Sequence, residues 1–426
     1  MRVKLAYGKE GLWVKLPDER VTVVEPKFAP GLPNEALALR RALHKPIGSP
    51  PLRELVKPGQ SVVVIFPDLT RPMPNDRVLS VLLTELEDAG VARERVTLIN
   101  ALGTHRPNTE EELVGMLGRR IYENYCVIQH DAFDQSGLEY MGVTSFGHEV
   151  WINRAYLGSD VKILTGFIEP HLFAGFSGGP KAVLPGLAGE RAVLGNHDYG
   201  MIAHPKATWG ITQGNPIWEE MAEMAARTAP TFLLNVTLNK QRQITGVFAG
   251  DLWQAHAAGA AFVRQMAMVP VPAPFDIVIT TNSGYPLDLN LYQAVKGMST
   301  AAQVVKTGGS IIAAAECWDG VPDHGQYKKL LHMADSPQAL LEIVSAPGFL
   351  MQDQWEAQVQ AQIQLKAEVY VKNSYLDEEE LRHALFLPCR DIEETLVGLL
   401  EKHGPEATIC VLPEGPQTIP YVADMI

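Results

Sequence analysis

The sequence predicts an α/β protein built from two α/β domains with mainly parallel sheets. Short runs rich in valine and isoleucine, such as 61–66, have the continuous apolar character of strands buried on both faces. Helical segments follow several of these runs, as in βαβ units. The chain has 426 residues, which is too many for one ordinary core, so two domains are expected.

The first half of the chain is expected to begin with a hairpin and to continue as strands that alternate with helices. The expected strands are 2–8, 11–16, 20–26, 61–66, 95–103 and 160–171, and the expected helices begin at 34 and 75 and after 109. Asn75 is a plausible cap of the helix 75–89. Asn108 or Thr109 can cap the helix that follows, and glutamates in its first turn favour that reading.

The second half is expected to hold an antiparallel pair, a linker and a second α/β unit. The pair is 230–239 with 243–250, followed by a helix at 251–268 and a proline-containing linker at 268–276. Beyond the linker, we expect a strand from 276, a helix at 288–306, a strand at 309–316, several helices between 323 and 403, and a final strand from 408. The expected domains are therefore 1–270 and 275–426, and the last segment, 408–426, is a candidate to pack back on the first domain.

The composition bounds the possible partners. Hydrophobic residues make up 46% of the chain and charged residues 20%, and the formal net charge is −13. The negative charge argues against nucleic acid or an anionic membrane as a partner. The four cysteines form no Cys-x-x-Cys pair, and the chain shows neither an apolar signal segment nor an apolar run of membrane length. We expect a soluble cytoplasmic protein, and the composition leaves room for a local basic pocket that binds a small anion.

Three of the expected parallel strands end in loops that carry polar side chains. The first loop offers Asp68, Thr70 and Arg71, of which arginine can bind a carboxylate or phosphate through two donors. The second loop offers His105, whose ordinary pKa suits acid/base chemistry. Because ligands bind at the carboxyl ends of strands in open α/β sheets, these loops are expected to converge. Taken alone, the first loop is better interpreted as an ordinary capped loop with a surface ion pair, whereas the second is equally compatible with a hydrogen-bonded loop histidine.

The third loop is the glycine-rich stretch EPHLFAGFSGGPKAVLPG, residues 169–186. Its glycines permit close backbone approach, so peptide N–H groups and Ser177 can cradle an anion beside Gly178 and Gly179. The spacing fits neither a Walker motif nor the dinucleotide fingerprint. Lys181 is a candidate phosphate partner, covalent attachment point or plain surface lysine. His171 and His197 lie too far apart in sequence to form a helical metal pair.

Two motifs in the second half supply further candidates. YQAVKG places Gln293 and Lys296 three residues apart, on one face of a helix with Tyr292 nearby. DQWEAQ supplies Trp355, an aromatic side chain that is more often part of a core or an interface than a cofactor lid.

Together, DLTRP, GTHRP, the stretch 169–186, GNHD at 195–198, YQAVKG and DQWEAQ resemble the nickel-dependent lactate racemase family. The motifs occur in the family's order from residue 68 to about 358, and no matching catalytic position departs from it. The resemblance implies a racemase or epimerase of a short 2-hydroxy acid, acting in a cleft between two domains by hydride transfer to and from a bound cofactor. It also implies that separate cofactor-biosynthesis enzymes are partners.

The resemblance further assigns roles to individual residues. The cofactor is the nickel–pincer nucleotide, a pyridinium-3-thioamide-5-thiocarboxylic acid mononucleotide, attached to Lys181 as a thioamide. His197 completes the nickel coordination, and His105 and His171 are the acid/base pair on opposite faces of the substrate. Residues near the cofactor are Asp68, Thr70, Arg71, Ser177, Gly178, Gly179, Tyr292 and Trp355. Arg71, Gln293 and Lys296 are implied to bind the substrate, with its carboxylate on Arg71 and Lys296.

Two other classes of protein remain open on the residues alone. A zinc-dependent hydrolase would use His105, His171 and His197 as ligands, but it leaves Lys181 without a role. A non-catalytic nucleotide-binding protein would bind a cofactor without needing either acid/base histidine.

Overall fold

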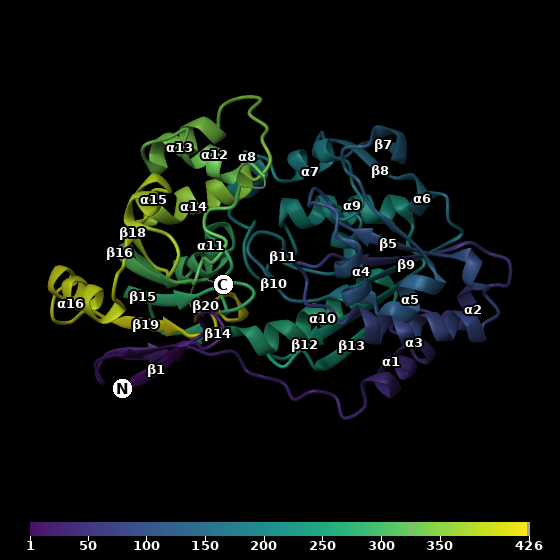
Figure 1. The fold of residues 1–426 in the computed structure, drawn as a ribbon, viewed down its shortest axis with the longest axis horizontal. Coiled ribbons are helices and arrows are strands. Elements are labelled where there is room, and N and C mark those ends of the chain that lie inside the picture. Colours follow the sequence, from purple (N-terminus) through teal and green to yellow (C-terminus); the bar gives the residue numbers. More distant parts are fainter. Residues whose placement is uncertain (324, 424–426) are drawn as a thin grey trace. The chain divides into compact units, whose positions relative to one another are not determined.

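The computed structural model describes residues 1–323 and 325–423, and it confirms a mixed α/β protein with largely parallel sheets. The chain divides into two compact units (Figure 1). Unit 1 comprises residues 1–27, 197–210 and 267–426, and unit 2 comprises 28–196 and 211–266. These bounds differ from the sequence expectation, because the first 27 residues and the short segment 197–210 belong to the same unit as the C-terminal half.

Unit 2 is built on a six-stranded sheet in the order β13-β12-β9-β4-β5-β6. All neighbours pair in parallel except β12 and β13, which form the expected antiparallel pair. The strands are β4 (Val62–Pro67), β5 (Val96–Ala101), β6 (Cys126–Gln129), β9 (Val161–Phe167), β12 (Phe232–Leu238) and β13 (Ile244–Gly250). Two small antiparallel pairs accompany the sheet: β7 (Leu138–Val143) with β8 (Glu149–Asn153), and β10 (Pro170–His171) with β11 (Gly175–Phe176).

The helices of unit 2 fill the connections between these strands. They are α1 (Glu35–His44), α2 (Leu52–Leu55), α3 (Asn75–Asp88), α4 (Glu110–Leu117), α5 (Arg119–Asn124), α6 (Arg154–Leu157), α7 (Glu190–Asn196), α9 (Pro216–Thr228) and α10 (Leu252–Ala267). One apolar cluster joins α1, α3 and α4 to side chains of β4, β5, β9 and β12. Every residue from Val62 to Phe66 is buried, as expected of a central parallel strand. The cluster thereby fixes the sheet whose strand ends carry the polar loops.

Unit 1 is built on a second six-stranded sheet, in the order β18-β17-β16-β15-β19-β3, and all of its pairs are parallel. Its strands are β3 (Val21–Val23), β15 (Phe275–Thr281), β16 (Val305–Ala314), β17 (Ala367–Lys372), β18 (Leu387–Pro388) and β19 (Ile409–Leu412). Its helices are α8 (Tyr199–Ala203), α11 (Leu291–Ala302), α12 (Tyr327–Leu331), α13 (Pro337–Val344), α14 (Gln354–Lys366), α15 (Glu378–His383) and α16 (Ile392–His403).

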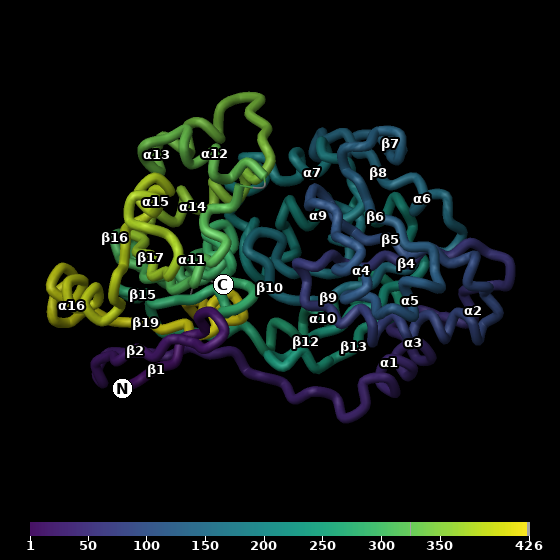
Figure 2. The backbone as a smooth tube through the Cα atoms, in the orientation of Figure 1, coloured from purple at the N-terminus to yellow at the C-terminus, as the bar shows by residue number. Residues whose placement is uncertain are grey.

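The two ends of the described chain meet within unit 1. The expected hairpin is present as β1 (Arg2–Leu5) with β2 (Leu12–Lys15), and β3 pairs with β19 at the edge of the sheet. In Figure 2 the purple N-terminal segment accordingly runs beside the yellow C-terminal segment. Near the end of the chain, β20 (Ile419–Val422) pairs in parallel with β14 (Met268–Val271). The end of the predicted segment 408–426, residues 424–426, lies outside the described residues.

Three local predictions were wrong. The linker 268–276 contains β14, in which Pro270 is tolerated because this is a two-stranded edge pairing. The several helices expected between 323 and 403 are present, but the prediction omitted β17 and β18, which lie in the same region. Asn75 does not cap α3: Pro74 occupies the N-cap position and Asn75 lies inside the first turn. Thr109, by contrast, caps α4 in a capping box with Glu112, as expected.

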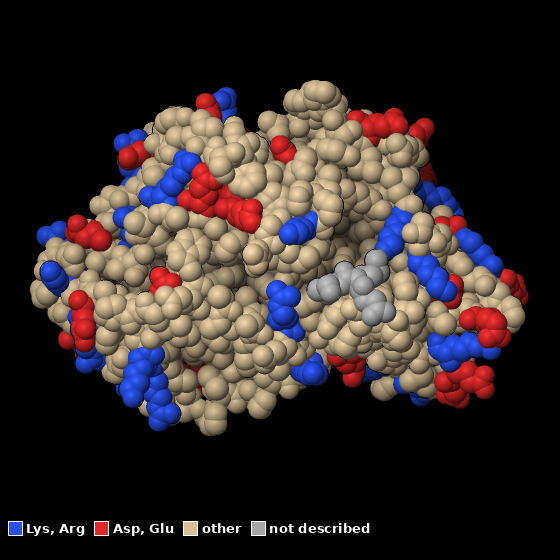
Figure 3. Space-filling view, turned by 180° about the vertical axis from the view of Figure 1, so that it is seen from behind, with Lys and Arg blue, Asp and Glu red and all other residues tan. Residues whose placement is uncertain are grey.

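Two further features concern membrane-spanning helices and surface charge. No helix among the described residues is long and apolar enough to cross a membrane. On the face drawn in Figure 3, acidic and basic side chains are interspersed, so the negative net charge does not gather there into one broad acidic field.

Candidate active site

The three polar loops predicted to converge follow three adjacent strands of unit 2. β4 lies between β9 and β5, and all three run in parallel, with Ile65 of β4 paired to Leu164 and to Ile99. Their carboxyl ends therefore open at the same edge of the sheet, which is where ligands bind in open α/β proteins. This edge brings together the loops of Asp68, His105 and the glycine-rich stretch.

Asp68 connects the first two of these loops. Its carboxylate accepts a hydrogen bond from His105 Nδ1 at 2.8 Å and from Thr70 Oγ1 at 2.9 Å. The Asp68 side chain is only 6% exposed, whereas that of His105 is 47% exposed. A carboxylate on Nδ1 sets the ring orientation and the tautomer, so Nε2 of a neutral His105 is left as the acceptor for a proton.

The charge of Asp68 is maintained by its neighbours. Burial alone raises the pKa of this carboxyl group, but His105, Arg71 and Thr70 together outweigh burial and hold the pKa below its ordinary value. Arg71 therefore lies within electrostatic range of Asp68, and its guanidinium group offers planar donors for an anionic ligand. The three candidates of the first loop and His105 form one cluster.

His171 and Lys181 are brought together within the third loop. His171 pairs with Gly175 across the short β10–β11 pair, and its Nδ1 accepts a hydrogen bond from the Ala174 N–H at 3.3 Å. Its Nε2 lies 3.4 Å from Lys181 Nζ. Because Nδ1 accepts, a neutral ring carries its proton on Nε2, and the amine can accept that proton in a hydrogen bond only when it is uncharged.

One side chain of the glycine-rich loop, that of Ser177, stabilises the loop by bonding to its own backbone. Ser177 Oγ accepts from the Glu169 N–H at 2.9 Å and donates to the Phe167 carbonyl at 2.7 Å, so this buried serine closes the loop on itself. Ser177 thus has a structural role that the sequence did not indicate.

Two loop-holding residues were missed by sequence reasoning. Asn235 of β12 accepts a hydrogen bond from the Gly179 N–H at 2.9 Å through Oδ1. His256 of α10 is buried and bonds the Ser177 carbonyl through Nε2 at 3.0 Å. Burial lowers the pKa of His256, so the ring is neutral and donates from Nε2. Each residue lies more than 50 positions from the loop residue that it binds, and no local motif marks either one.

Close contacts with neighbouring groups explain why glycine occupies positions 175 and 178 of the loop. Gly178 has a φ of +74°, and a Cβ atom there would lie 2.7 Å from Asn235 Oδ1. Gly175 has a φ of +76°, and a Cβ atom there would lie 2.2 Å from the Ile211 carbonyl oxygen. Neither position accepts a side chain without moving the backbone.

The remaining candidates belong to unit 1, where α11 and α14 position them. His197 and Trp355 contact each other with ring centroids 5.1 Å apart, and Trp355 Nε1 donates to Tyr292 Oη at 3.0 Å. Gln358 donates to the Tyr199 carbonyl at 3.0 Å, which ties the segment after His197 to the same helix. Trp355, Tyr292 and His197 therefore form one aromatic cluster.

Lys296 and Gln293 lie on the same face of α11, as predicted, and Lys296 Nζ donates to Gln293 Oε1 at 2.5 Å. Glu356 of α14 is almost fully buried near Lys296 and was missed by the sequence analysis. Burial raises the pKa of Glu356 to about 8; Lys296 opposes this rise and Asp353 adds to it. A buried carboxyl group beside a candidate substrate-binding lysine is an additional polar element of this cluster.

The described side chains do not form a metal site made of protein ligands alone. Within residues 1–323 and 325–423, no group of three or more His, Cys, Asp or Glu side chains is placed to hold a metal ion. A zinc centre needs three protein ligands, so the hydrolase alternative has no preformed site in the described part of the chain.

Comparisons with known proteins agree with the fold and the motifs. Residues 7–210 match the family model "Lactate racemase N-terminal domain", and residues 271–419 match "Lactate racemase C-terminal domain". The lactate racemase of Thermoanaerobacterium thermosaccharolyticum is 35% identical over 421 residues, covering 98% of each chain. The lactate racemase of Lactiplantibacillus plantarum is 35% identical over 418 residues, covering 97% of this chain and 98% of that protein.

Solved structures show the same relationship. The lactate racemase apoprotein of T. thermosaccharolyticum superposes with a TM-score of 0.93 at 34% identity, covering 99% of this chain and 100% of that one. A Thermotoga maritima protein shares the fold, with a TM-score of 0.69 at 20% identity and coverage of 92% and 99%.

The fold and these matches define an isomerase of the racemase type. The chain belongs to the lactate racemase family.

Proposed function

We propose that this enzyme interconverts the two enantiomers of a short 2-hydroxy acid, lactate or a close relative, with a nickel–pincer nucleotide attached to Lys181. The observation that carries the proposal is the geometry of unit 2. His171 Nε2 lies 3.4 Å from Lys181 Nζ. His105, which is hydrogen-bonded to the Asp68 carboxylate, follows a strand of the same sheet. The two full-length relatives named lactate racemase support lactate as the first substrate to test.

The residues present fit such a cofactor. Attachment through an amide-type bond requires an uncharged amine, and the His171 ring offers Lys181 a hydrogen-bond partner for that form. Because the described residues contain no set of three metal-binding side chains, most donors to a nickel ion must come from the cofactor itself. The His197 imidazole is then a suitable protein donor, since imidazole suits nickel.

The protein's own groups account for the acid/base part of the reaction. His105, with Asp68 on Nδ1, has Nε2 available to take the proton of the substrate hydroxyl group. We assign His171 to the opposite enantiomer, because removing a hydroxyl proton from either face needs a base on each side. Its Nε2 can take that proton only in the tautomer that carries the ring proton on Nδ1 and gives up the bond from the Ala174 N–H. The bound cofactor supplies the acceptor for the hydride that leaves the substrate carbon, so the protein needs no redox group of its own.

The substrate carboxylate is assigned to the cationic groups. Arg71 provides a planar fork for a carboxylate, and Lys296 provides an ammonium group steadied by Gln293. Tyr292 and Trp355, joined by a hydrogen bond, are the aromatic side chains assigned to the cofactor ring, where they would help to exclude water. We place the enzyme in the cytoplasm, together with the enzymes that make the cofactor.

The test is intact mass spectrometry, metal analysis and a chiral assay on protein produced together with the cofactor-making enzymes. We expect a mass increase on Lys181, bound nickel, and racemisation of lactate or another 2-hydroxy acid. His105→Ala and His171→Ala are expected to keep the mass increase and to lose turnover by a factor of about 10² or more. An unmodified Lys181 with full activity, or zinc in place of nickel, would refute the proposal.

A further inference from the structure

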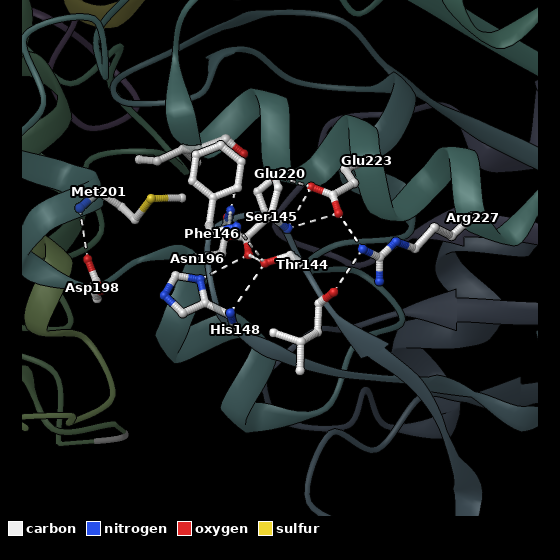
Figure 4. A network of polar contacts seen from close by, with 12 residues as sticks. Thr144, Ser145, Phe146, His148, Asn196, Asp198, Met201, Glu220, Glu223 and Arg227 are labelled. Atoms are coloured by element: carbon white, nitrogen blue, oxygen red, sulfur yellow. Dashed lines mark hydrogen bonds and ion pairs between the residues drawn. The ribbon is translucent and has the colours of Figure 1, made fainter.

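The motif GNHD is supported by a buried polar network whose centre is Glu220 of α9. Glu220 is 0% exposed, and its carboxyl group accepts three hydrogen bonds. The donors are Thr144 Oγ1 at 2.6 Å, His148 Nδ1 at 2.9 Å and Asn196 Nδ2 at 2.9 Å (Figure 4). Such a network is expensive to bury and is stable only because each donor has its acceptor.

This network fixes the two residues that precede His197. Asn196 is itself 0% exposed, and its Nδ2 also donates to the Ile217 carbonyl at 3.1 Å. Gly195 lies against the His148 ring, because a Cβ atom at this position would come within 2.7 Å of His148 Cγ. The glycine and the asparagine of the motif are therefore explained by His148 and Glu220.

The residue after His197 and the far end of its segment are also anchored. Asp198 caps α8 by accepting from the Met201 N–H at 2.8 Å. Asn215, the N-cap of α9, donates to the carbonyls of Ile211 and Phe173 at 2.9 and 2.8 Å. The helix that carries Glu220 thus holds the chain immediately before and immediately after the segment 197–210, which belongs to unit 1.

We propose that Glu220 is a positioning residue that, through Asn196, presents the His197 imidazole to the metal in a fixed orientation. The inference rests on the proposed function, in which His197 is the protein's nickel ligand. Groups behind a metal ligand commonly change metal affinity by about 10- to 100-fold when removed. Glu220→Gln keeps the size of the side chain but replaces one accepting oxygen with an NH₂ group. That NH₂ group then faces at least one of the three groups that donate to Glu220, and a hydrogen bond is lost.

The experiment measures nickel retention in loaded protein, separately from cofactor attachment. For Glu220→Gln we expect the same mass increase on Lys181 as in the wild type. Nickel is expected to be lost to a chelator such as EDTA about 10- to 100-fold faster, and the visible absorption of the loaded site is expected to shift. Asn196→Ala removes the hydrogen bond between Asn196 and Glu220, while Glu220 keeps its bonds from Thr144 and His148. We expect this variant to lose nickel at a similarly increased rate, and it provides the test if Glu220→Gln does not fold.

The matched control is Glu85→Gln. Glu85 is also a buried carboxylate of unit 2, paired with Arg53 at 2.7 Å and His44 at 3.0 Å, and the structure shows no bond from it to the GNHD segment. It is expected to lower the melting temperature and to leave nickel retention unchanged. A network that serves stability alone would make Glu220→Gln behave like this control.

A further variant, His197→Ala, distinguishes a failure of the proposed function from a failure of the positioning role of Glu220. If His197→Ala releases nickel while Glu220→Gln and Asn196→Ala both retain it as the wild type does, the positioning role is wrong and the proposed function stands. If His197→Ala itself retains nickel normally, the assignment of the metal ligand is wrong, and the role of Glu220 is refuted with it.

Discussion

Asp68 accepts hydrogen bonds from His105 and Thr70 while lying almost wholly out of solvent. The sequence indicated each of these three residues as a candidate, because each follows an expected strand. It did not indicate that Asp68 orients His105, since 37 positions separate the pair. Asn235, His256 and Glu220 were missed for the same reason: each holds a loop that is remote in sequence.

Asp68→Asn tests the orientation of His105. The amide keeps the shape but loses the negative charge that stabilises His105 once it has taken a proton, so we expect kcat to fall by about 10² or more. The mass increase on Lys181 is expected to persist, as measured by intact mass spectrometry. Thr70→Val removes only one donor to the carboxylate and is expected to have a smaller effect. Wild-type turnover in Asp68→Asn would show that His105 does not depend on this carboxylate.

At the scale of elements, strands were predicted well where the chain marks their ends and poorly where it does not. The strand preceding Asp68 ends in proline and a polar loop, and it was placed within one residue. By contrast, β14 begins directly after α10 at Ala267, and β17 begins directly after α14 at Lys366. At β17 no glycine, proline or polar turn marks the change from helix to strand, so periodicity alone cannot locate it. At β14 the prolines of 268–276 indicated a linker instead of a strand.

Helix α14 is buried on all sides from Gln354 to Ala361 although this stretch carries polar side chains, and Glu356 is its ionisable residue. Its pKa is raised from an ordinary 4.5 to about 8, so between these values the folded protein holds a proton that the unfolded chain has released. The stabilising contribution is therefore complete below about pH 4.5 and is lost as the pH rises to about 8.

We accordingly expect the melting temperature of the wild type to fall more steeply between pH 5 and pH 8 than that of Glu356→Gln, as measured by calorimetry. Asp276→Asn is the control in the same unit. Burial raises the pKa of Asp276, but Lys306 and Thr408 outweigh burial and keep it below its ordinary value, outside this range. Identical slopes for wild type and Glu356→Gln would contradict the assignment.

At the scale of the whole molecule, the sequence indicated two α/β domains but not the membership of the N-terminal residues. Strand β3 completes the sheet of unit 1 by pairing with β19, 388 positions later for the pair Val21 and Ile409. The hairpin adds Val3, Leu5, Val14 and Leu16 to an apolar cluster with Ile277 and Ile409. Long-range pairing of this kind leaves no local pattern, which is why the sequence assigned these residues to the first domain.

Deleting residues 1–27 is expected to destabilise unit 1 selectively. The deletion exposes the edge of β19 and removes five buried aliphatic side chains, namely Val3, Leu5, Val14, Leu16 and Val24, each contributing about 1.5–3 kcal/mol. Hydrogen exchange followed by mass spectrometry is expected to show loss of protection in β15 and β19 and retention in β4 and β9. Wild-type protection throughout unit 1 would refute this role for the N-terminal segment.

The pairing of β3 with β19 also constrains biosynthesis. Strand β3 is translated long before its partner β19, so the nascent chain must keep β3 without that partner while all of unit 2 is being made. Residues 28–266 supply all of unit 2 and are complete much earlier, so that half can acquire its structure while the remainder is still being made. A pause or truncation before β19 is translated would release a polypeptide in which unit 2 is complete. In that polypeptide the apolar β1–β2 hairpin and β3 would lack part of the sheet against which they pack.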